Sequence, residues 1–273
     1  MVKIVFDMGE SHTRVAGSDD GRTLSEPVIF ATDQIFESGA NQLISAITQQ
    51  AGERPVTKII GGVAGTLNPD HSQLVAAPNL PGWLNKPIAT RLSERFNASV
   101  TLQNDTALVG LGEACVGAGR GKQLVSYLTV STGVNGVNII NQKIQASTWG
   151  FELGYQIIGA DSQGAPLRLE PAIGGHSLAE RYGKPAGEIK DALVWTEIIH
   201  HLAIGLHNTI LHWSPELVVL GGSMMQDIPI AQVSTEVTKL LTAFPHIPEF
   251  RLAELGERGG LLGALAFDAT ANS

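Results

Sequence analysis

The chain opens with the stretch VKIVFDMGESHTRVAG, which occupies residues 2–17. Its first six residues form an apolar run that ends in Asp7, and Gly9 follows two positions later. Such a run, bounded by a glycine-bearing turn, is typical of a buried strand, and the alternation over residues 13–17 predicts a second strand. The stretch therefore places a carboxylate at the end of a strand, directly before a turn.

Strands and helices alternate along the rest of the chain. After a third strand at 24–30, apolar side chains recur at helical spacing over residues 38–51, and a buried strand follows at 57–63. Further strands are predicted at 99–102, 124–130, 137–140 and 217–220, and further helices at 85–97, 105–116, 188–213, 229–243 and 259–271. This alternation predicts α/β layers, and the three early strands predict a mixed sheet with an antiparallel edge.

The length of 273 residues is long for one core and sufficient for two lobes, since domains cluster at roughly 100–150 residues. No low-complexity linker interrupts the chain, so the boundary is expected within compact structure. We place it near residue 104. Residues 1–104 then form an N-terminal lobe that is completed by the helix at 259–271, and residues 105–258 form a C-terminal lobe.

Composition argues against several classes of partner. The formal net charge is -8 and no cluster of lysine and arginine occurs, whereas nucleic-acid binding needs a basic surface. No stretch approaches the ~18 apolar residues of a membrane span, and the N-terminus does not resemble a signal peptide. Cys115 is the only cysteine, which excludes an intrachain disulfide and is typical of a reducing compartment. We therefore expect a cytoplasmic protein without nucleic-acid or membrane partners.

Three glycine-bearing turns, at residues 7–14, 131–136 and 221–223, each follow a predicted strand. Glycine lets backbone N–H groups approach phosphates closely because it lacks a Cβ atom and permits positive φ. An aspartate at the end of the first strand is suited to hold Mg²⁺, and hydroxyl groups in the turns are suited to phosphate oxygens. None of the turns matches a Walker loop or a GxGxxG fingerprint, which argues against P-loop and Rossmann folds.

The order of these motifs resembles the ROK family of sugar kinases, within the actin/hexokinase-like ATPase superfamily. The matching segments are a first phosphate motif at 7–16, a sugar-side segment at 62–65 and 77–83 (with NLPGW at 79–83), a catalytic stretch at 103–105 (QND), 110–113 and 117–119, a second phosphate motif at 129–136, and an adenosine motif at 217–223. The resemblance covers nearly the whole chain. It implies a two-lobed α/β fold of the actin-like ATPase (ribonuclease H-like) type, with mixed sheets and an interlobe cleft.

The resemblance also implies a reaction, the ATP-dependent phosphorylation of a hexose hydroxyl, with Asp105 as the general base. Phosphoryl transfer depends mostly on positioning and charge stabilisation, and a carboxylate accepts the proton of the hydroxyl. The alternative for Asp105 is a helix N-cap, a position that aspartate favours in any protein. The implied sugar-binding residues are Gly65, Asn79, Asn104, Asp105, Glu152, Tyr155 and Glu170. The implied phosphate-binding residues are Asp7, Gly9, Ser11, His12, Thr132, Gly133, Gly221 and Gly222, of which Asp7 also meets the Mg²⁺ that accompanies ATP.

The sequence departs from the family pattern at several of these positions. Many members hold a structural zinc with three cysteines and a histidine, whereas residues 157–168 contain no cysteine and Tyr155 replaces the histidine. Because tetrahedral zinc needs four good ligands, no zinc is expected. Glu10 occupies a glycine position of the first phosphate motif, and His12 and Ser131 are also replacements. Glu10 either faces solvent, contributes to a metal site or slows catalysis.

Other features have plainer interpretations. Glu197 and His201 have the i,i+4 spacing of metal ligands, but His200, His207 and His212 lie on other parts of the same predicted helix, so packing and solvation are favoured over a metal. Glu152 and Glu170 have the alternative of solvated acids near loops. Trp83 is suited either to stack on a sugar ring or to pack in the core.

The sequence leaves the substrate open. Glucose is favoured, and fructose, N-acetylglucosamine, N-acetylmannosamine and allose remain alternatives, with polyphosphate as an alternative donor. A sugar-binding protein with lost or residual catalysis is the second hypothesis, motivated by Glu10 and Tyr155. A sugar-sensing repressor is not expected, because the first phosphate motif begins at residue 7 and leaves no room for a helix-turn-helix before it. A homodimer is implied by the resemblance alone.

Overall fold

The computed structural model describes residues 1–271, which form two compact units. The first unit comprises Met1–Val116, Ala146–Gly150 and the C-terminal segment that begins at Leu255. The second unit comprises Gly117–Gln145 and Phe151–Glu254. The chain therefore leaves the first unit after Val116, returns to it at Ala146–Gly150, and enters it again at Leu255. Within residues 1–271, no helix combines the length and the apolar character needed to cross a bilayer.

The first unit is built on a five-stranded mixed sheet with the order β3-β2-β1-β4-β7. Its strands are β1 (Val2–Met8), β2 (His12–Ser18), β3 (Val28–Ala31), β4 (Val56–Val63) and β7 (Ser99–Asn104). β1, β4 and β7 are parallel, whereas β2 and β3 continue the sheet in antiparallel fashion. A short hairpin of β5 (Thr66–Leu67) and β6 (Leu74–Ala76) follows β4. The predicted mixed sheet with an antiparallel edge is confirmed.

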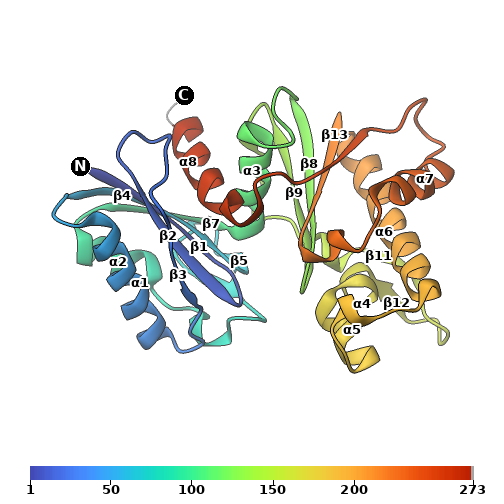
Figure 1. Cartoon of the computed structure of the whole chain (residues 1–273), viewed down its shortest axis with the longest axis horizontal. Helices are drawn as coiled ribbons and strands as arrows, with labels where there is room; N and C mark the ends of the chain where they lie inside the picture. The colour runs from blue at the N-terminus through green and yellow to red at the C-terminus, as the bar shows by residue number, and fades with distance from the viewer. Residues whose placement is uncertain (272–273) are drawn as a thin grey trace. The chain divides into compact units, whose positions relative to one another are not determined.

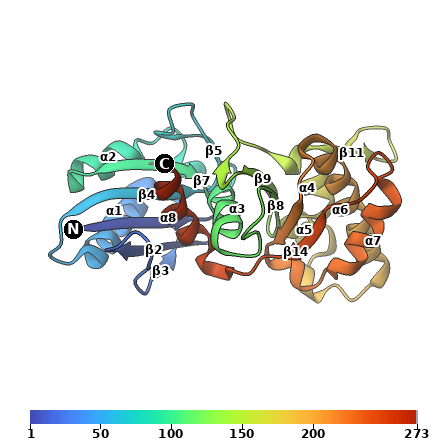
Figure 2. The ribbon, with the colours of Figure 1, turned by 90° about the horizontal axis from the view of Figure 1, so that it is seen from above.

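Helices cover both faces of this sheet, because successive side chains of a buried strand point to opposite sides. Ile4 and Phe6 of β1 pack in the core under α1 (Phe36–Ala51) and α2 (Ile88–Phe96), whereas Val5 packs in the core under α3 (Asp105–Val116) and α8 (Gly259–Ala271). Figure 1 shows α1 and α8 on opposite sides of the strands, and Figure 2 shows α3 beside α8.

Besides this apolar packing, ion pairs and a close backbone approach join α8 to the rest of the first unit. Asp268 is buried and accepts hydrogen bonds from the ammonium groups of Lys3 on β1 (2.5 Å) and Lys58 on β4 (2.6 Å). Gly263 approaches α3 so closely that an added Cβ atom would lie 1.8 Å from the carbonyl oxygen of Leu108. The predicted lobe division assigns residues 105–116 to the second lobe; in the structure α3 belongs to the first unit because it packs on α8.

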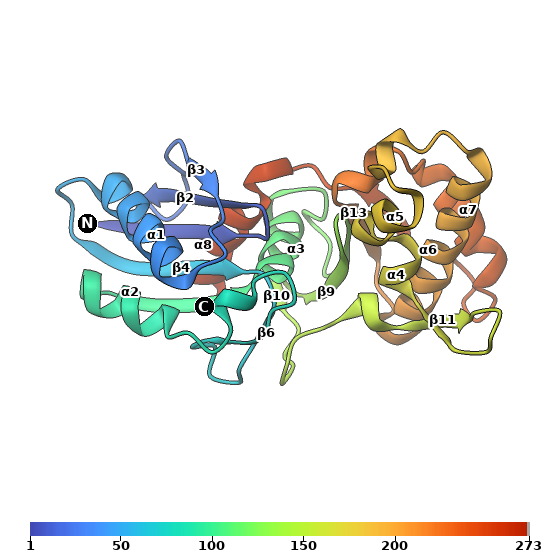
Figure 3. The same ribbon diagram turned by 90° about the horizontal axis from the view of Figure 1, so that it is seen from below.

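The second unit contains a sheet of similar design, with the order β10-β9-β8-β13-β14. Its strands are β8 (Leu124–Val130), β9 (Val134–Ile140), β10 (Lys143–Ile144), β13 (Leu217–Gly221) and β14 (Glu249–Leu252). β8, β13 and β14 are parallel, and β9 and β10 are antiparallel additions. The apolar core of the unit also includes residues of α4 (Leu169–Ile173), α5 (Gly175–Tyr182), α6 (Ala192–Trp213) and α7 (Ile230–Leu240), which gather together in Figure 3.

Several predicted boundaries differ from those observed, for local reasons. The third strand begins at Val28 rather than residue 24 because Pro27 has no N–H group to give to a sheet ladder. The helix predicted from 188 begins at Ala192, where the Asp191 carboxylate accepts the N–H of Leu193 at 2.9 Å. Short elements were not predicted, namely β14, α4, α5 and a small hairpin of β11 (Ile157–Ala160) and β12 (Pro166–Arg168).

Candidate active site

The carboxyl ends of β1, β4 and β7 bring two carboxylates together in the first unit. Asp7 lies on β1 opposite Gly62 of β4, and Asp105 follows β7, the next strand along. A Cβ atom added at Gly62 would lie 3.3 Å from Asp7 Oδ1 and 3.3 Å from the Cα atom of Asp105. The two acids therefore flank a position that has no side chain, at the edge of the sheet where α/β proteins commonly bind ligands.

The surroundings raise the pKa of both carboxyl groups. Burial, and then the negative charge of Asp105, raise the pKa of Asp7 to about 7, against the opposing effect of the Arg14 guanidinium on the neighbouring strand. Burial also raises the pKa of Asp105, although the N–H of Thr106 donates to its Oδ1 at 2.7 Å. A base whose pKa is close to the working pH transfers protons efficiently, and perturbed acids of this kind are typical of functional sites.

Asn104, rather than Asp105, caps helix α3. The Oδ1 atom of Asn104 accepts the N–H of Ala107 at 3.0 Å, which is the hydrogen bond expected of an N-cap residue. The Nδ2 group of Asn104 donates to the carbonyl of Gly65 at 3.1 Å, so these two predicted sugar-binding residues are joined directly. The capping role that competed with catalysis for Asp105 is therefore filled by its neighbour.

The first phosphate turn connects β1 to β2. The N–H of Gly9 donates to the carbonyl of His12 at 3.1 Å and closes the turn. Ser11 and His12 are exposed, and Glu10 is half-buried. Hence Glu10, which departs from the family pattern, is neither fully exposed nor fully buried.

The sugar-side segment of the first unit ends in a buried tryptophan. Asn79 is exposed in a turn closed by the hydrogen bond from Leu80 N–H to the carbonyl of Ala77 at 3.1 Å. Trp83 is 2% exposed and meets the Phe36 ring edge to face at 5.2 Å between centroids. Trp83 therefore packs in the core of this unit, which is one of its two predicted roles.

Two residues beside Asp7 were missed by the sequence analysis. A Cβ atom added at Gly260 of α8 would lie 2.6 Å from both Cγ and Oδ2 of Asp7, so glycine makes room for the carboxylate. The Nε group of Arg14 is buried without a hydrogen-bond partner, and its Nη2 lies 3.3 Å from Glu257. The sequence did contain a sign of the role of Gly260. Three glycines in one short helix disfavour helix formation, so their presence indicates that another segment packs closely against the helix.

In the second unit, residues 170–176 hold the second phosphate turn. The N–H of Val134 donates to Oε2 of Glu170 at 2.7 Å, and a Cβ atom at Gly133 would lie 2.6 Å from the same oxygen. The carbonyls of Ser131 and Thr132 accept N–H groups from the start of α5, at 2.8 and 3.0 Å. Glu170, predicted to bind sugar, is therefore part of the support of the phosphate turn.

The third glycine turn lies next to the second. β13 runs parallel to β8, with Gly221 opposite Thr129, so both turns emerge at the same edge of the sheet. Gly222 has φ 94°, and a Cβ atom there would lie 2.2 Å from the carbonyl oxygen of Val130, so only glycine fits. The hydroxyls of Ser131 and Ser223 are 3.1 Å apart, which joins the two turns through a residue that replaces a family glycine.

The predicted sugar-binding pair of the second unit lies at a short helix, η2 (Leu153–Tyr155), which Glu152 precedes. Glu152 and Tyr155 are both exposed. Asn135 holds this segment, because its Oδ1 accepts the N–H of Leu153 at 3.2 Å and that of Gly136 at 2.8 Å.

Residues 157–168, the segment without cysteine, form the β11–β12 hairpin. The Arg168 guanidinium lies 5.5 Å from the centroid of the Tyr155 ring and donates to the Tyr155 carbonyl at 3.0 Å. No group of three or more His, Cys, Asp or Glu side chains within residues 1–271 is arranged to hold a metal. On α6, Glu197 and His201 approach to 4.0 Å, and burial lowers the pKa of His201.

The fold and these turns define an α/β protein of the actin-like ATPase class, in which two acids and three glycine turns stand at the carboxyl ends of parallel strands. The ROK family model matches residues 3–270, and the chain belongs to the ROK family. The predicted family and fold are confirmed.

Several known proteins that resemble the chain are named as sugar kinases. The "N-acetylgalactosamine kinase AgaK" of Shewanella sp. (strain ANA-3) is 27% identical, over 84% of this chain and 83% of that protein. The crystal structure of a ROK hexokinase from Thermus thermophilus matches with a TM-score of 0.84 and 26% identity, covering 100% of both chains. A ROK family glucokinase from Streptomyces griseus, in complex with glucose and AMPPNP, matches with a TM-score of 0.79 and 20% identity over 100% of both chains. The comparisons support the predicted enzyme class, a sugar kinase.

Proposed function

We propose that this ROK family sugar kinase transfers the γ-phosphoryl group of MgATP to a hydroxyl group of a hexose, with Asp105 as the general base. Asp105 accepts the proton of the attacking hydroxyl. Asp7 faces the Mg²⁺ that ATP brings, and the glycine turns offer N–H groups to its phosphates. The proposed sugar-binding residues are, in the first unit, Gly65, Asn79 and Asn104 with Asp105, and in the second unit, Glu152, Tyr155 and Glu170.

The cap formed by Asn104 is the observation that supports this role for Asp105. An aspartate at the first turn of a helix usually stabilises that helix by capping it. Here the Ala107 N–H is bound by Asn104, while burial raises the pKa of Asp105. This half-buried carboxyl group is costly to ionise and is not needed as the helix cap. These properties are best explained by a role in proton transfer.

Mg²⁺ fits the residues around Asp7. Burial and the repulsion from Asp105 raise the pKa of Asp7. Hard cations prefer carboxylate oxygens, and the charge of such an ion would offset both effects. We propose ATP as the donor, a homodimeric enzyme without structural zinc, and a cytoplasmic location.

Glucose is the favoured acceptor, with fructose, N-acetylglucosamine and N-acetylmannosamine as alternatives. The known proteins reported above carry different sugar names, so the choice depends on the side chains that contact each hydroxyl. A panel of hexoses and N-acetylhexosamines is therefore needed to choose the substrate.

The test is ADP release from MgATP with each sugar of that panel, for the wild type and for Asp105→Asn. The variant is expected to lose roughly 10²–10⁴-fold in kcat, the usual contribution of a general base, and to unfold at no lower temperature, since a buried charge is removed. Asp70→Asn is the matched control, because Asp70 lies exposed in a loop of the same unit and its hydrogen bonds are to the neighbouring residues Asn68 and Ser72. Turnover by Asp105→Asn equal to that of the wild type would exclude Asp105 as the base.

The alternative function is a sugar-binding protein with lost or residual catalysis, and Glu10 is its motivation. A carboxylate about 4 Å from the γ-phosphate would repel it by about 1 kcal/mol in water and by more where water is excluded. Sugar binding without ADP release for any sugar would favour this alternative. A Glu10→Gly variant that is faster than the wild type would instead show that Glu10 slows a working kinase.

A further inference from the structure

Thr32, which follows β3, makes three hydrogen bonds to the first phosphate turn and its flank. Its hydroxyl group donates to the carbonyl of Gly9 at 2.8 Å, and its N–H donates to the carbonyl of Ser11 at 3.0 Å. Its Oγ1 also lies 2.9 Å from Oγ1 of Thr13, which is buried on β2. One residue outside the motif therefore holds two of the turn's backbone carbonyls.

The direction of these hydrogen bonds follows from counting protons. A hydroxyl group has one proton, and that of Thr32 is used on Gly9, so the hydroxyl of Thr13 must donate to Thr32. The result is a chain that runs from Thr13 through Thr32 to the backbone of Gly9. Hydrogen bonds in such a chain polarise and strengthen one another.

This chain determines where the next backbone N–H points. In a planar trans peptide the carbonyl and the N–H point in opposite directions. With the Gly9 carbonyl held toward Thr32, the N–H of Glu10 is directed away from Thr32. The backbone donor of the glycine turn is thus oriented by Thr32, whatever the side chain at position 10 does.

The connector between β3 and α1, residues 32–35, is itself anchored at its far side. The carbonyl of Asp33 accepts the indole N–H of Trp83 at 2.8 Å. A Cβ atom added at Gly82 would lie 1.9 Å from the carbonyl oxygen of Gln34, so the connector packs directly on the sugar-side segment. The connector cannot move away from the phosphate turn without disturbing this packing.

We propose that Thr32 is a positioning residue for nucleotide binding, which acts by holding the first phosphate turn in the shape that presents its N–H groups to MgATP. The proposal rests on the proposed function. Thr32 does not itself touch a phosphate; it acts through Gly9 and Ser11. It follows that Thr32 affects the nucleotide more than the sugar.

The test compares Thr32→Val, which has the same shape without the hydroxyl, with Thr32→Ser, which keeps the hydroxyl. We expect Thr32→Val to raise the KM and the calorimetric Kd for MgATP about five- to tenfold, as for the loss of one or two hydrogen bonds, with the KM for sugar within about twofold. Thr32→Ser should restore most of the MgATP affinity. If Thr32 had a merely structural role, Thr32→Val would lower the stability of the protein without raising the KM for MgATP relative to the KM for sugar.

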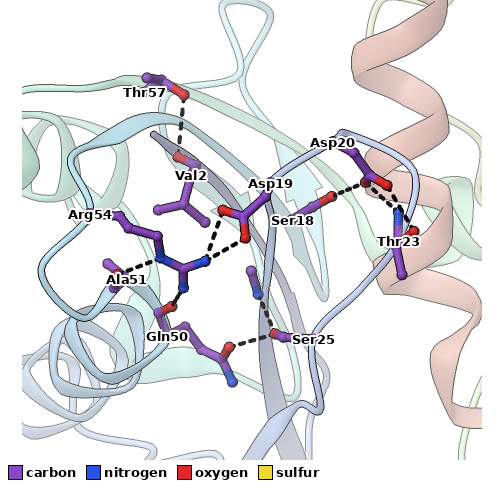
Figure 4. Close-up of polar contacts among 11 residues, drawn as sticks. Val2, Ser18, Asp19, Asp20, Thr23, Ser25, Gln50, Ala51, Arg54 and Thr57 are labelled. Atoms are coloured by element: carbon purple, nitrogen blue, oxygen red, sulfur yellow. Dashed lines mark hydrogen bonds and ion pairs between the residues drawn. The ribbon is translucent and has the colours of Figure 1, made fainter.

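Thr57→Val is the matched control. Its hydroxyl donates to the carbonyl of Val2 at 3.2 Å, at the opposite end of the same sheet (Figure 4). This variant loses a comparable bond and should keep the wild-type kinetics. Thr13→Val removes the first donor of the chain and should weaken MgATP binding in the same sense, which provides a second test if Thr32→Val does not fold.

The proposal is overturned if Thr32→Val and Thr13→Val bind MgATP as the wild type does, or if Thr32→Ser is as impaired as Thr32→Val. A wild type that phosphorylates no sugar would refute the proposed function instead. In that case the calorimetric comparison of MgATP binding would still decide the role of Thr32.

Discussion

Replacing Gly260 by alanine should lower the activity but leave the free energy of unfolding almost unchanged. The added Cβ atom would lie 2.6 Å from Cγ and Oδ2 of Asp7, whereas ordinary contact begins at 3.4 Å, so the carboxylate must move by about 0.8 Å. A misplacement of about 1 Å can cost 10²-fold in rate, so we expect kcat/KM for MgATP to fall roughly 10- to 100-fold. Alanine is favoured over glycine in a helix by up to about 1 kcal/mol, which offsets the strain of the contact in the free energy of unfolding.

The assay is ADP release at varied MgATP, with thermal unfolding measured on the same preparations. Gly187→Ala is the control, because the nearest atom to its added Cβ, an oxygen of Asp227, is 3.7 Å away, an ordinary contact. Wild-type kcat/KM in a Gly260→Ala protein would refute the argument. It would mean that the position of the Asp7 carboxylate does not limit the reaction.

Two further predictions concern the stability of the nucleotide-free protein. Folding raises the pKa of Asp7 from 3.8 to about 7. Between these pH values the folded state keeps a proton that the unfolded state has lost. The free energy of unfolding contributed by Asp7 therefore decreases as the pH rises from about 4 to 7. Urea unfolding at several pH values should therefore give a flatter pH dependence for Asp7→Asn, and an unchanged slope would contradict the pKa assignment. Asp268→Asn, which weakens the bonds to Lys3 and Lys58, should lower the free energy of unfolding by roughly 1–3 kcal/mol. Asp19→Asn, at the exposed pair with Arg54 in Figure 4, should lower it by less than about 1 kcal/mol, and equal losses would show that burial of Asp268 does not matter.

The sequence sufficed for those parts of the site that are local in the chain. Asp7 with its glycine turn, and Asp105 at the junction of β7 and α3, were predictable because a strand end, a turn and a helix start each leave a pattern over a few residues. The same patterns predicted most of the core strands and long helices. Short elements such as β11 and β12 carry too few residues to show a period, so the hairpin could not be foreseen.

Contacts between distant segments were not predictable in this way. Nothing local distinguishes Thr32 from any threonine at a strand end, and its role follows only from the register that brings β3 beside β2. The cap of α3 was ambiguous, because Asn104 and Asp105 are both good capping residues and only the backbone decides between them. The hydrogen bond from the Val134 N–H to Glu170 could not be predicted either, because it depends on how α4 meets the second phosphate turn.

The placement of α8 has a consequence for how the protein is made. All of the second unit, which lies within residues 117–254, leaves the ribosome before the segment that begins at Leu255. The first unit begins the chain, but Lys3 and Lys58 cannot bind Asp268 before α8 has been synthesised. Helix α3 likewise cannot pack on the glycines of α8 before that point. Domains generally fold as they emerge, N-terminal first. For this chain we expect the reverse order, in which the sheet that carries Asp7 closes only after the second unit has folded.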